Sequence, residues 1–329
     1  MSALGPTLEA FFTERLLGQR GASPRTVASY RDTFRLLVVF AAKRHGRPPS
    51  KLDVTDLDAE TIGAFLAHLE TERHNSVTTR NVRLGAIRSF FSFAALRHPE
   101  HAGTIGRVLA IAPKRFERNL VTYLTAKEIE ALLGACDTSS WVGLRDRTMF
   151  LLAVETGLRV SELIGLNNDD VTLEHGAHVH VVGKGRKERR TPLLGEAVAV
   201  LRSWRAERGG GPSDPFFPTS TGRRLSRDAV EHRIAHCVEI AGASCTSLRS
   251  KHVTAHTLRH SCAMRLLQAG NDVATIALFL GHEQISTTGI YLHADMTQKE
   301  RALARTTPFG IKPGRYQPDD RLLAFLEAL

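Results

Sequence analysis

The sequence lacks the long apolar runs and the paired cysteines that mark membrane-spanning and disulfide-stabilised proteins. No apolar run approaches the roughly 18 residues that a helix needs to cross a bilayer. The N-terminal segment does not have the charged-then-apolar layout of a signal peptide. The cysteines are scattered and include no CxxC pair, which argues against a disulfide framework and a zinc knuckle; they are Cys136, Cys237, Cys245 and Cys262. These absences predict a cytoplasmic protein with reduced thiols and no membrane partner.

The chain has an excess of positive charge. Its 329 residues include 44 Lys and Arg against 34 Asp and Glu, for a net charge of +10. An excess of this size favours a polyanionic partner, with nucleic acid first and an anionic membrane surface second. The length suits two domains, and 42% hydrophobic residues are enough for ordinary folded cores.

The first third of the chain, residues 1–112, has only helical patterns. Ser23 is a predicted N-cap, with Pro24 at the first position of the helix that it begins. Apolar residues then recur at helical spacing in four segments, which predicts a four-helix bundle without strands. The predicted helices lie near Thr7–Leu17 and over residues 23–44, 58–73 and 76–97.

Basic residues recur along these helices and in the segment that follows them. On the helices they are Arg25, Arg31, Arg35, Arg80, Arg83 and Arg88. Each by itself is as well explained by a solvated helix face, but together they suit contacts with a phosphate backbone. Residues 113–124 are predicted to be a linker, in which Lys114 and Arg115 are further candidates for DNA contact.

The rest of the chain mixes helices with a few strands. Strand patterns at 171–176, 178–183 and 188–193 predict a small three-stranded antiparallel sheet. Helices are predicted from Thr125 and over 144–156, 195–208, 226–241, 255–269, 272–280 and 287–304. The predicted fold is therefore mainly α, with a helical domain at 1–112, an α+β domain at 125–306 and a C-terminal tail at 307–329.

Five short segments of the second domain combine residues that carry chemistry. They are TGLRVSEL (156–163), VVGKGRKERRTPL (181–193), HTLRH (256–260), LGH (280–282) and the segment that contains Tyr291. HTLRH has the spacing of a zinc site, but it lacks the Glu of HExxH and places a cation beside the two imidazoles. The loop around Lys184 does not fit GxxxxGK[ST], so nucleotide binding is not expected. We expect neither a metal nor a cofactor.

The same residues suit a reaction at a phosphodiester. Two guanidinium groups neutralise the non-bridging oxygens, and Arg does so with two parallel hydrogen bonds. Imidazoles donate to the phosphate or move a proton, and a flexible Lys protonates the departing alkoxide. A Tyr hydroxyl attacks phosphorus once nearby cations favour the phenolate. For Arg189 and Arg190 the sequence leaves two alternatives open, an exposed strand and a DNA contact.

These segments resemble, in order and spacing, the active site of the tyrosine recombinase (phage integrase) family. The motifs that carry the resemblance are TGLRxSEL, GKGxKxRxxPL, HxLRH and LGHxxxxTTxxY. The resemblance covers about residues 20–300, because the helical first part looks like the family's core-type DNA-binding domain. It implies a site-specific recombinase that cuts and rejoins DNA through a 3′-phosphotyrosyl intermediate and a Holliday junction, without metal or ATP.

The resemblance also implies a role for each residue that matches a motif. Arg159 and Arg259 would bind the scissile phosphate, and Tyr291 would be the nucleophile. Lys184 would be the general acid, and His256 would help to deprotonate the nucleophile or hold the phosphate. His282 would donate to a phosphate oxygen. Glu162 and His260 would act indirectly, Glu162 by steadying Arg159 and His260 by packing behind the site.

The C-terminal tail suggests how protomers assemble, and two other functions remain open. Residues 319–329 form an amphipathic pattern, and the resemblance implies that this tail docks in trans within a homotetramer on DNA. Related recombinases are further possible partners. The alternatives are a type IB topoisomerase, which relaxes DNA as a monomer, and an accessory DNA-binding subunit that needs an active partner.

Overall fold

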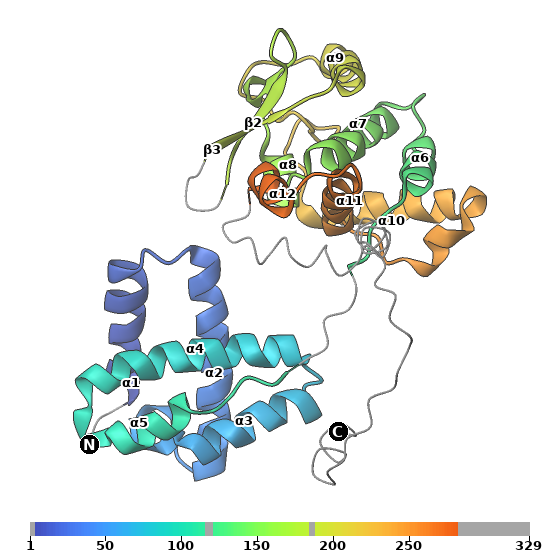
Figure 1. Ribbon diagram of the computed structural model, residues 1–329. Coiled ribbons are helices and arrows are strands. Elements are labelled where there is room, and N and C mark those ends of the chain that lie inside the picture. The colour runs from blue at the N-terminus through green and yellow to red at the C-terminus, as the bar shows by residue number, and fades with distance from the viewer. Residues whose placement is uncertain (1–3, 116–120, 184–187, 282–329) are drawn as a thin grey trace, which may run out of the picture. The chain divides into compact units, whose positions relative to one another are not determined.

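The computed structural model describes residues 4–115, 121–183 and 188–281 (Figure 1). The chain divides into two compact units, Met1–Arg118 and Asn119–Leu329. Lys184, His282 and Tyr291 lie outside the described residues, as do the predicted helix at 287–304 and the tail. Each unit is described by itself.

The N-terminal unit consists of helices joined by short turns. Its elements are α1 (Leu4–Ala10), the π-helix η1 (Phe11–Gln19), α2 (Pro24–His45), α3 (Ala59–Thr71), α4 (Val77–Arg97) and α5 (Ala102–Leu109), with 3-10 turns at Pro49–Lys51, Val54–Leu57 and Pro99–His101. The prediction of four helices was incomplete, because α5 is a fifth. Helix α5 has only eight residues, too few to show a clear helical period in the sequence. It packs on α3 and α4.

The first helix also differs from the prediction. It begins at Leu4, and from Phe11 to Gln19 it has π geometry, which the apolar spacing did not indicate. Phe11 has no exposed surface and packs edge-on against Phe34 of α2 and Phe90 of α4. These aromatic contacts join three helices, and in Figure 1 α4 lies across α2.

Local capping chemistry explains where α2 begins. Ser23 is in extended conformation and its hydroxyl accepts from the Thr26 amide, with Pro24 at the first helical position. The helix ends at Gly46, whose φ of 63° closes the last turn. The predicted cap is confirmed.

The C-terminal unit surrounds a small sheet with helices. The helices are α6 (Ala126–Gly134), α7 (Trp141–Thr156), α8 (Val160–Gly165), α9 (Gly195–Arg208), α10 (Arg227–Ser244), α11 (Ala255–Gln268) and α12 (Val273–Leu280), with 3-10 turns at Asn168–Asp170 and Thr246–Ser250. In Figure 1 α7 and α11 lie beside each other near the middle of the unit, and they are in direct contact. The predicted helices of this unit up to residue 280 are present, most of them with ends shifted by one to three residues.

The sheet has the predicted three antiparallel strands in the order β1-β2-β3. They are β1 (Val171–Thr172), β2 (His178–Val182) and β3 (Glu188–Pro192). The first strand is much shorter than predicted, because the chain turns before Gly176, whose φ is 75°. Val179 and Val181 of β2 are buried on one face, opposite Thr191 and Arg189 of β3.

In the described part of the chain, no helix is both long enough and apolar enough to cross a membrane.

Candidate functional site

Arg159 lies at the junction between two helices. Helix α7 ends at Gly157, which has a φ of 60°, and Arg159 is the N-cap of α8. Its backbone N–H donates to Glu162 Oε2 at 2.8 Å, and its Nη1 donates to Glu162 Oε1 at 2.9 Å. Its Nη2 donates to the carbonyl oxygen of Gly281 at 3.1 Å. The cap of α8 therefore fixes both the backbone and the guanidinium of this arginine.

Arg259 is on the inward face of α11 and is only 2% exposed. It follows Ala255 by four residues and precedes Ala263 by four, and both of these alanines are buried. Its guanidinium donates to the carbonyl oxygen of Gly157 and, at 2.8 Å, to that of Leu280. A buried arginine is tolerated here because its hydrogen bonds go to helix-terminal carbonyls that lack intrahelical partners.

The two arginines meet at the same point of the chain. They are 100 positions apart in the sequence, yet they bond to the carbonyls of the adjacent residues Leu280 and Gly281. These carbonyls end helix α12, where Gly281 has a φ of 64°. The fold thus brings together two of the predicted phosphate ligands and the residue that precedes His282 in the chain.

His256 is one helical turn before Arg259 and His260. Its ring is edge-on to that of His260, with the centroids 4.7 Å apart. Although the His256 side chain is exposed on one side, desolvation by the residues around it lowers its pKa below the ordinary value, and the positive charges of Arg259 and Arg159 lower it further. The imidazole is therefore neutral at pH 7 and is able to accept a proton.

Glu162 is the acidic centre of the site. Burial acts to raise its pKa, but hydrogen bonds from Arg189 and from the Arg159 amide outweigh burial, and the pKa falls to about 2. Its carboxylate bonds to Arg159 Nη1 and also to both terminal nitrogens of Arg189, at 2.9 and 2.8 Å. Glu162 is therefore ionised and shared between two cations.

Arg189 is a residue whose role the sequence left open. In β3 it has the same parity as Thr191 and Leu193, which are buried, while Glu188 and Arg190 face outward. The sequence analysis left Arg189 open between an exposed strand and a DNA contact, although this alternation is a signal that could have indicated the inward face. What it could not supply was the partner, because Glu162 is 27 residues away in another element.

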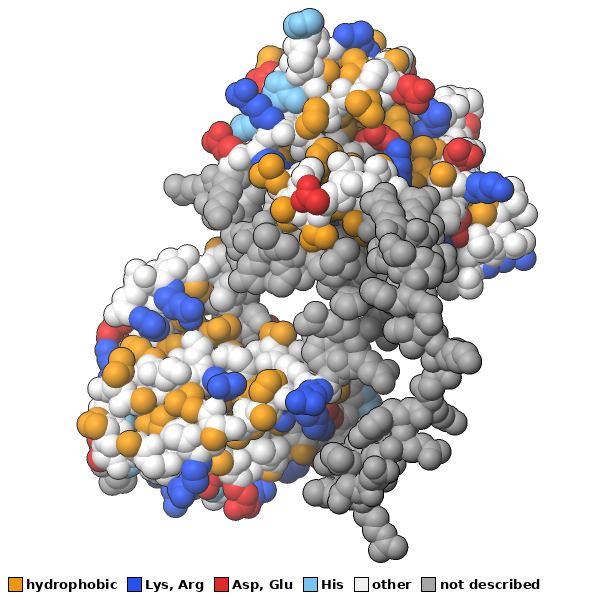
Figure 2. Space-filling model, in the orientation of Figure 1, with side chains coloured by type: hydrophobic (Ala, Val, Ile, Leu, Met, Phe, Trp, Pro, Cys, Tyr) orange, Lys and Arg blue, Asp and Glu red, His pale blue; other side chains and the backbone are white. Residues whose placement is uncertain are grey.

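The basic residues of the N-terminal unit fall into different environments. In Figure 2, Lys and Arg side chains on the visible face of this unit are scattered among apolar and uncharged ones. The exposed members of the predicted set are Arg25, Arg31, Arg35, Arg88, Lys114 and Arg115. Arg31 pairs with Asp32. Arg83 is half-buried, and its Nη1 has no hydrogen-bond partner.

Arg80 differs from the expectation of a phosphate-contacting cation. It is 7% exposed, because it shares the buried face of α4 with Leu84 and Ile87. Its Nε lies 3.9 Å from Glu70, and its Nη1 donates to the Ala112 carbonyl at 3.4 Å. Arg80 therefore fastens the segment after α5 to the bundle.

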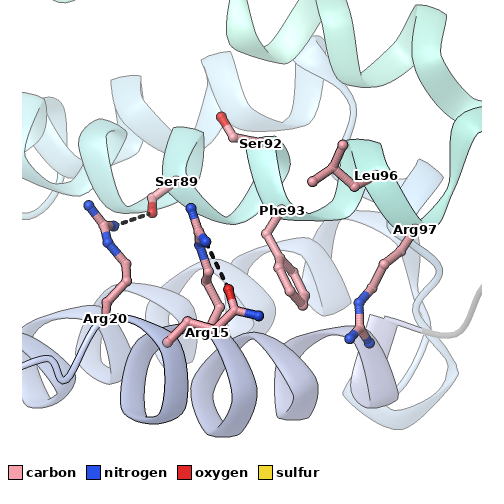
Figure 3. A pocket seen from close by; sticks show the side chains of 8 residues that line it. Arg15, Arg20, Ser89, Ser92, Phe93, Leu96 and Arg97 are labelled. Atoms are coloured by element: carbon pink, nitrogen blue, oxygen red, sulfur yellow. Dashed lines mark hydrogen bonds between the residues drawn. The ribbon is translucent and has the colours of Figure 1, made fainter.

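A pocket of about 430 Å³ lies between η1 and α4 on the N-terminal unit (Figure 3). Arg15, Arg20 and Arg97 enter it, and Leu96 at its edge is 86% exposed. These cations are hydrogen-bonded within the unit: Arg15 donates to Gln19, Arg20 to Ser89 and Arg97 to Glu14. This concentration of arginines was not among the predicted sites.

No group of three or more His, Cys, Asp or Glu side chains in the described ranges is arranged to hold a metal ion. The site instead consists of two clamped arginines, a neutral imidazole and a shared carboxylate. Arginines fixed in this way beside a neutral imidazole suit the binding of an anionic group such as a phosphate.

Comparisons with known proteins identify the family. The Phage integrase family model matches residues 122–298, and the N-terminal SAM-like domain of phage integrases matches residues 10–98. The y4rC protein of Sinorhizobium fredii, an integrase/recombinase by name, is 52% identical over 100% of this chain and 99% of its own. Tyrosine recombinase XerD of Pseudomonas aeruginosa is 34% identical over 94% of this chain and 100% of its own. The chain belongs to the phage integrase family, the tyrosine-type site-specific recombinases.

Solved structures show the same fold. The XerH site-specific recombinase bound to palindromic difH substrate has a TM-score of 0.67 at 24% identity, covering 88% of this chain and 82% of that one. The Tn1549 transposon integrase in complex with transposon right end DNA has a TM-score of 0.70 at 17% identity, covering 90% of this chain and 98% of that one.

Proposed function

We propose that this protein cuts and rejoins DNA strands at specific sites through a 3′-phosphotyrosyl intermediate and a Holliday junction. The observation that carries the proposal is the convergence of Arg159 and Arg259 at the end of α12, in a chain of the tyrosine recombinase family. Solved relatives named as recombinases and integrases are bound to DNA, which supports duplex DNA as the substrate.

The reaction divides among the residues as follows. Arg159 and Arg259 neutralise the non-bridging oxygens of the scissile phosphate, and His282 donates to a phosphate oxygen. Tyr291 attacks phosphorus, displaces the 5′-oxygen and becomes esterified to the 3′-phosphate, while Lys184 protonates the departing oxygen. The phosphoester energy is kept in the tyrosyl ester, so neither ATP nor a metal ion is required. Attack by a second 5′-hydroxyl then releases the tyrosine.

The neutral state of His256 suits the first proton transfer. An imidazole that is uncharged at pH 7 accepts the phenolic proton of Tyr291 as the oxygen attacks. The two arginines that lower its pKa also favour the phenolate over the phenol. Phosphate binding and activation of the nucleophile therefore depend on the same charges.

The N-terminal unit would hold the DNA backbone. Exposed Arg25, Arg31, Arg88 and Arg115 supply positive charge that suits contacts with phosphate oxygens. Each of these contacts is expected to weaken binding uniformly across DNA sequences when it is removed. We place the reaction in the cytoplasm, in keeping with the four free cysteines.

The proposal is tested by covalent trapping. The protein is incubated with nicked DNA from the regions flanking its own gene, and a denaturing gel reveals any covalent adduct. We expect a shifted band for the wild type and none for Tyr291→Phe. DNA binding without an adduct in either protein would overturn the assignment of a self-sufficient enzyme and favour an accessory subunit.

We also propose that residues 319–329 dock in trans on a neighbouring protomer of a homotetramer. An apolar pocket of about 340 Å³ on the C-terminal unit, lined by Leu194, Leu266 and Phe279 among others, suits the apolar side of this segment. Leu194 is 71% exposed, although it is large and apolar.

Two variants test the docking. Deletion of 315–329 and Leu194→Asp should both abolish assembly of complexes that contain two DNA sites, while binding to a single site stays unchanged. Leu96→Asp, at a leucine of the other unit that is even more exposed, is the control. Normal assembly by the deletion variant, measured on native gels, would rule out this role of the tail.

A further inference from the structure

The carboxylate of Glu162 lies between Arg159 and Arg189, and each of these arginines donates hydrogen bonds to both carboxylate oxygens. Arg159 bonds to Oε1 through Nη1 and to Oε2 through its backbone N–H. Arg189 bonds to Oε1 through Nη1 and to Oε2 through Nη2, in the parallel two-bond geometry that suits Arg and carboxylate. The Glu162 side chain is 5% exposed and that of Arg189 is 14% exposed, so solvent screens their charges weakly.

This arrangement answers an electrostatic difficulty. A carboxylate that fixes Arg159 also cancels its charge, and a neutral Arg–Glu pair attracts a phosphodiester only weakly. With Arg189 included, the group of Arg159, Glu162 and Arg189 has a net charge of +1. Positive charge at this point matters most in the transition state of phosphoryl transfer, where negative charge on the phosphate oxygens increases.

We propose that Arg189 is a positioning residue that compensates the charge of Glu162, so that Glu162 orients Arg159 without weakening its attraction for the scissile phosphate. The inference rests on the proposed function for its catalytic consequence. For anion binding it rests on the contacts alone. It gives a role to the strand β3, which otherwise contributes only to the sheet.

The position of Arg189 against Gly281 supports this role. A Cβ added to Gly281 would lie 3.0 Å from Arg189 Nη1 and 3.1 Å from its Cδ, so the guanidinium packs directly on this glycine. Arg159 bonds to the carbonyl of the same residue. Arg189 therefore contacts the two groups that hold Arg159, the Glu162 carboxylate and the end of α12.

A role in folding alone would make different predictions. Strand β3 is also held by its backbone pairing with β2, from Glu188 opposite Val182 to Pro192 opposite His178. We therefore expect Arg189→Gln to fold. If Arg189 acts through its charge, then removing the opposing charge of Glu162 should restore function. If Arg189 only supports the fold, each further substitution should reduce activity further.

The test is a charge-compensation cycle. Its members are the wild type, Arg189→Gln, Glu162→Gln and the double variant, with Arg189→Lys retaining the charge without the fork. Arg190→Gln on the outward face of the same strand is the matched control. The Gln that replaces Glu162 keeps one of the two hydrogen bonds from Arg159, because its amide oxygen accepts and its amide nitrogen does not. Circular dichroism and thermal melting confirm that each variant is folded.

The first measurement is the rate of covalent adduct formation at saturating DNA. We expect Arg189→Gln to be about tenfold slower, the size of an interaction that shifts a pKa by about one unit. Arg189→Lys and the double variant should recover most of this loss, and Arg190→Gln should stay within about twofold of the wild type. A double variant as slow as Arg189→Gln, or slower, would overturn the inference.

The second measurement does not depend on catalysis. Inorganic phosphate is titrated at constant ionic strength, and its effect on the melting temperature is measured relative to Arg159→Ala, which reports binding elsewhere on the protein. The part of the shift that depends on Arg159 should decrease in Arg189→Gln and return in the double variant. Equal shifts in the wild type and Arg189→Gln would contradict the inference even if no DNA substrate were cleaved.

Discussion

Arg259 donates a hydrogen bond to the carbonyl oxygen of Leu280 at 2.8 Å and thereby joins α11 to the C-terminal end of α12. The same guanidinium donates to the carbonyl of Gly157, where α7 ends. One buried cation thus satisfies carbonyls at the ends of two helices, where the helix dipoles favour positive charge. The residue proposed to bind the phosphate therefore also holds three helices of the C-terminal unit together.

Replacing Arg259 with Lys should therefore reduce both stability and activity. A single ammonium group cannot reach the Gly157 and Leu280 carbonyls in the same geometry, so at least one buried acceptor loses its partner. We expect a loss of about 1–3 kcal/mol in the free energy of unfolding, measured by urea denaturation. Adduct formation should fall by about 100-fold or more.

Arg265→Lys is the matched control for this substitution. Arg265 is on the same helix, is exposed and pairs with Glu155. Its replacement should change the free energy of unfolding by less than about 0.5 kcal/mol. Equal stability of the Arg259→Lys and Arg265→Lys variants would show that the buried hydrogen bonds of Arg259 contribute nothing to the fold.

Gly281→Ala should impair catalysis more than backbone strain alone explains. Its φ of 64° costs a side chain about 1 kcal/mol, and the added Cβ would lie 3.0 Å from Arg189 Nη1. Gly270→Ala is the control, because Gly270 also has a positive φ, 93°, but has open space around its Cβ position. Both variants should lose similar stability, while adduct formation should slow only in Gly281→Ala. Equal rates would argue against a close fit between Arg189 and Gly281.

Glu128 should make the stability of the C-terminal unit depend on pH. Burial acts to raise its pKa, but hydrogen bonds from Lys251, Ser247 and the Thr125 amide outweigh burial, and the pKa falls to about 2. Because this pKa lies below the ordinary value of 4.5, the stabilisation is complete above about pH 4.5 and is lost as pH falls towards 2.

The corresponding variant is Glu128→Gln. It should be less stable than the wild type by about 2–3 kcal/mol at pH 7, and the difference should narrow as the pH falls from about 4.5 towards 2. Urea denaturation of both proteins at each pH measures this difference in the free energy of unfolding. Glu130→Gln, at an exposed position of the same helix, should show little difference at any pH. A gap that stayed constant with pH would mean that the charge of Glu128 is not what stabilises the unit.

His256 should titrate below its ordinary pKa of 6.5, because partial desolvation and the charges of Arg259 and Arg159 disfavour the imidazolium. NMR titration of its ring, assigned by comparison with His256→Gln, measures the midpoint. Arg227→Gln should raise it, since Arg227 also lowers the pKa and is exposed. A midpoint at or above 6.5 would exclude a neutral imidazole tuned by these arginines.

Much of the fold was readable from local patterns. The caps at Ser23, Thr125 and Ser226 begin helices as predicted, because capping depends on a hydroxyl and on an amide three residues away. The helix α5 was missed because eight residues are too few for a clear period. The length of β1 was overestimated, since β-branched residues near a turn resemble a strand whether or not they pair.

The environment of individual arginines was not readable in the same way. Arg80 and Arg88 occur on one helix, yet Arg80 is buried beside Glu70 and Arg88 is exposed. Arg189 was undecided between a solvated strand and a DNA contact, and it is bonded to Glu162. These outcomes depend on which element packs on each face, and that is a property of the folded chain.

The sequence by itself determined the order of helices and strands, the positive charge and the residue types of the five motifs, because these depend on local spacing and composition. Only the tertiary structure decided that Arg159 and Arg259 meet at the end of α12 and that Glu162 is shared with Arg189. Hydrogen bonds and charge interactions act over a few ångströms, and residues 27 to 122 positions apart come within that range only when the helices pack.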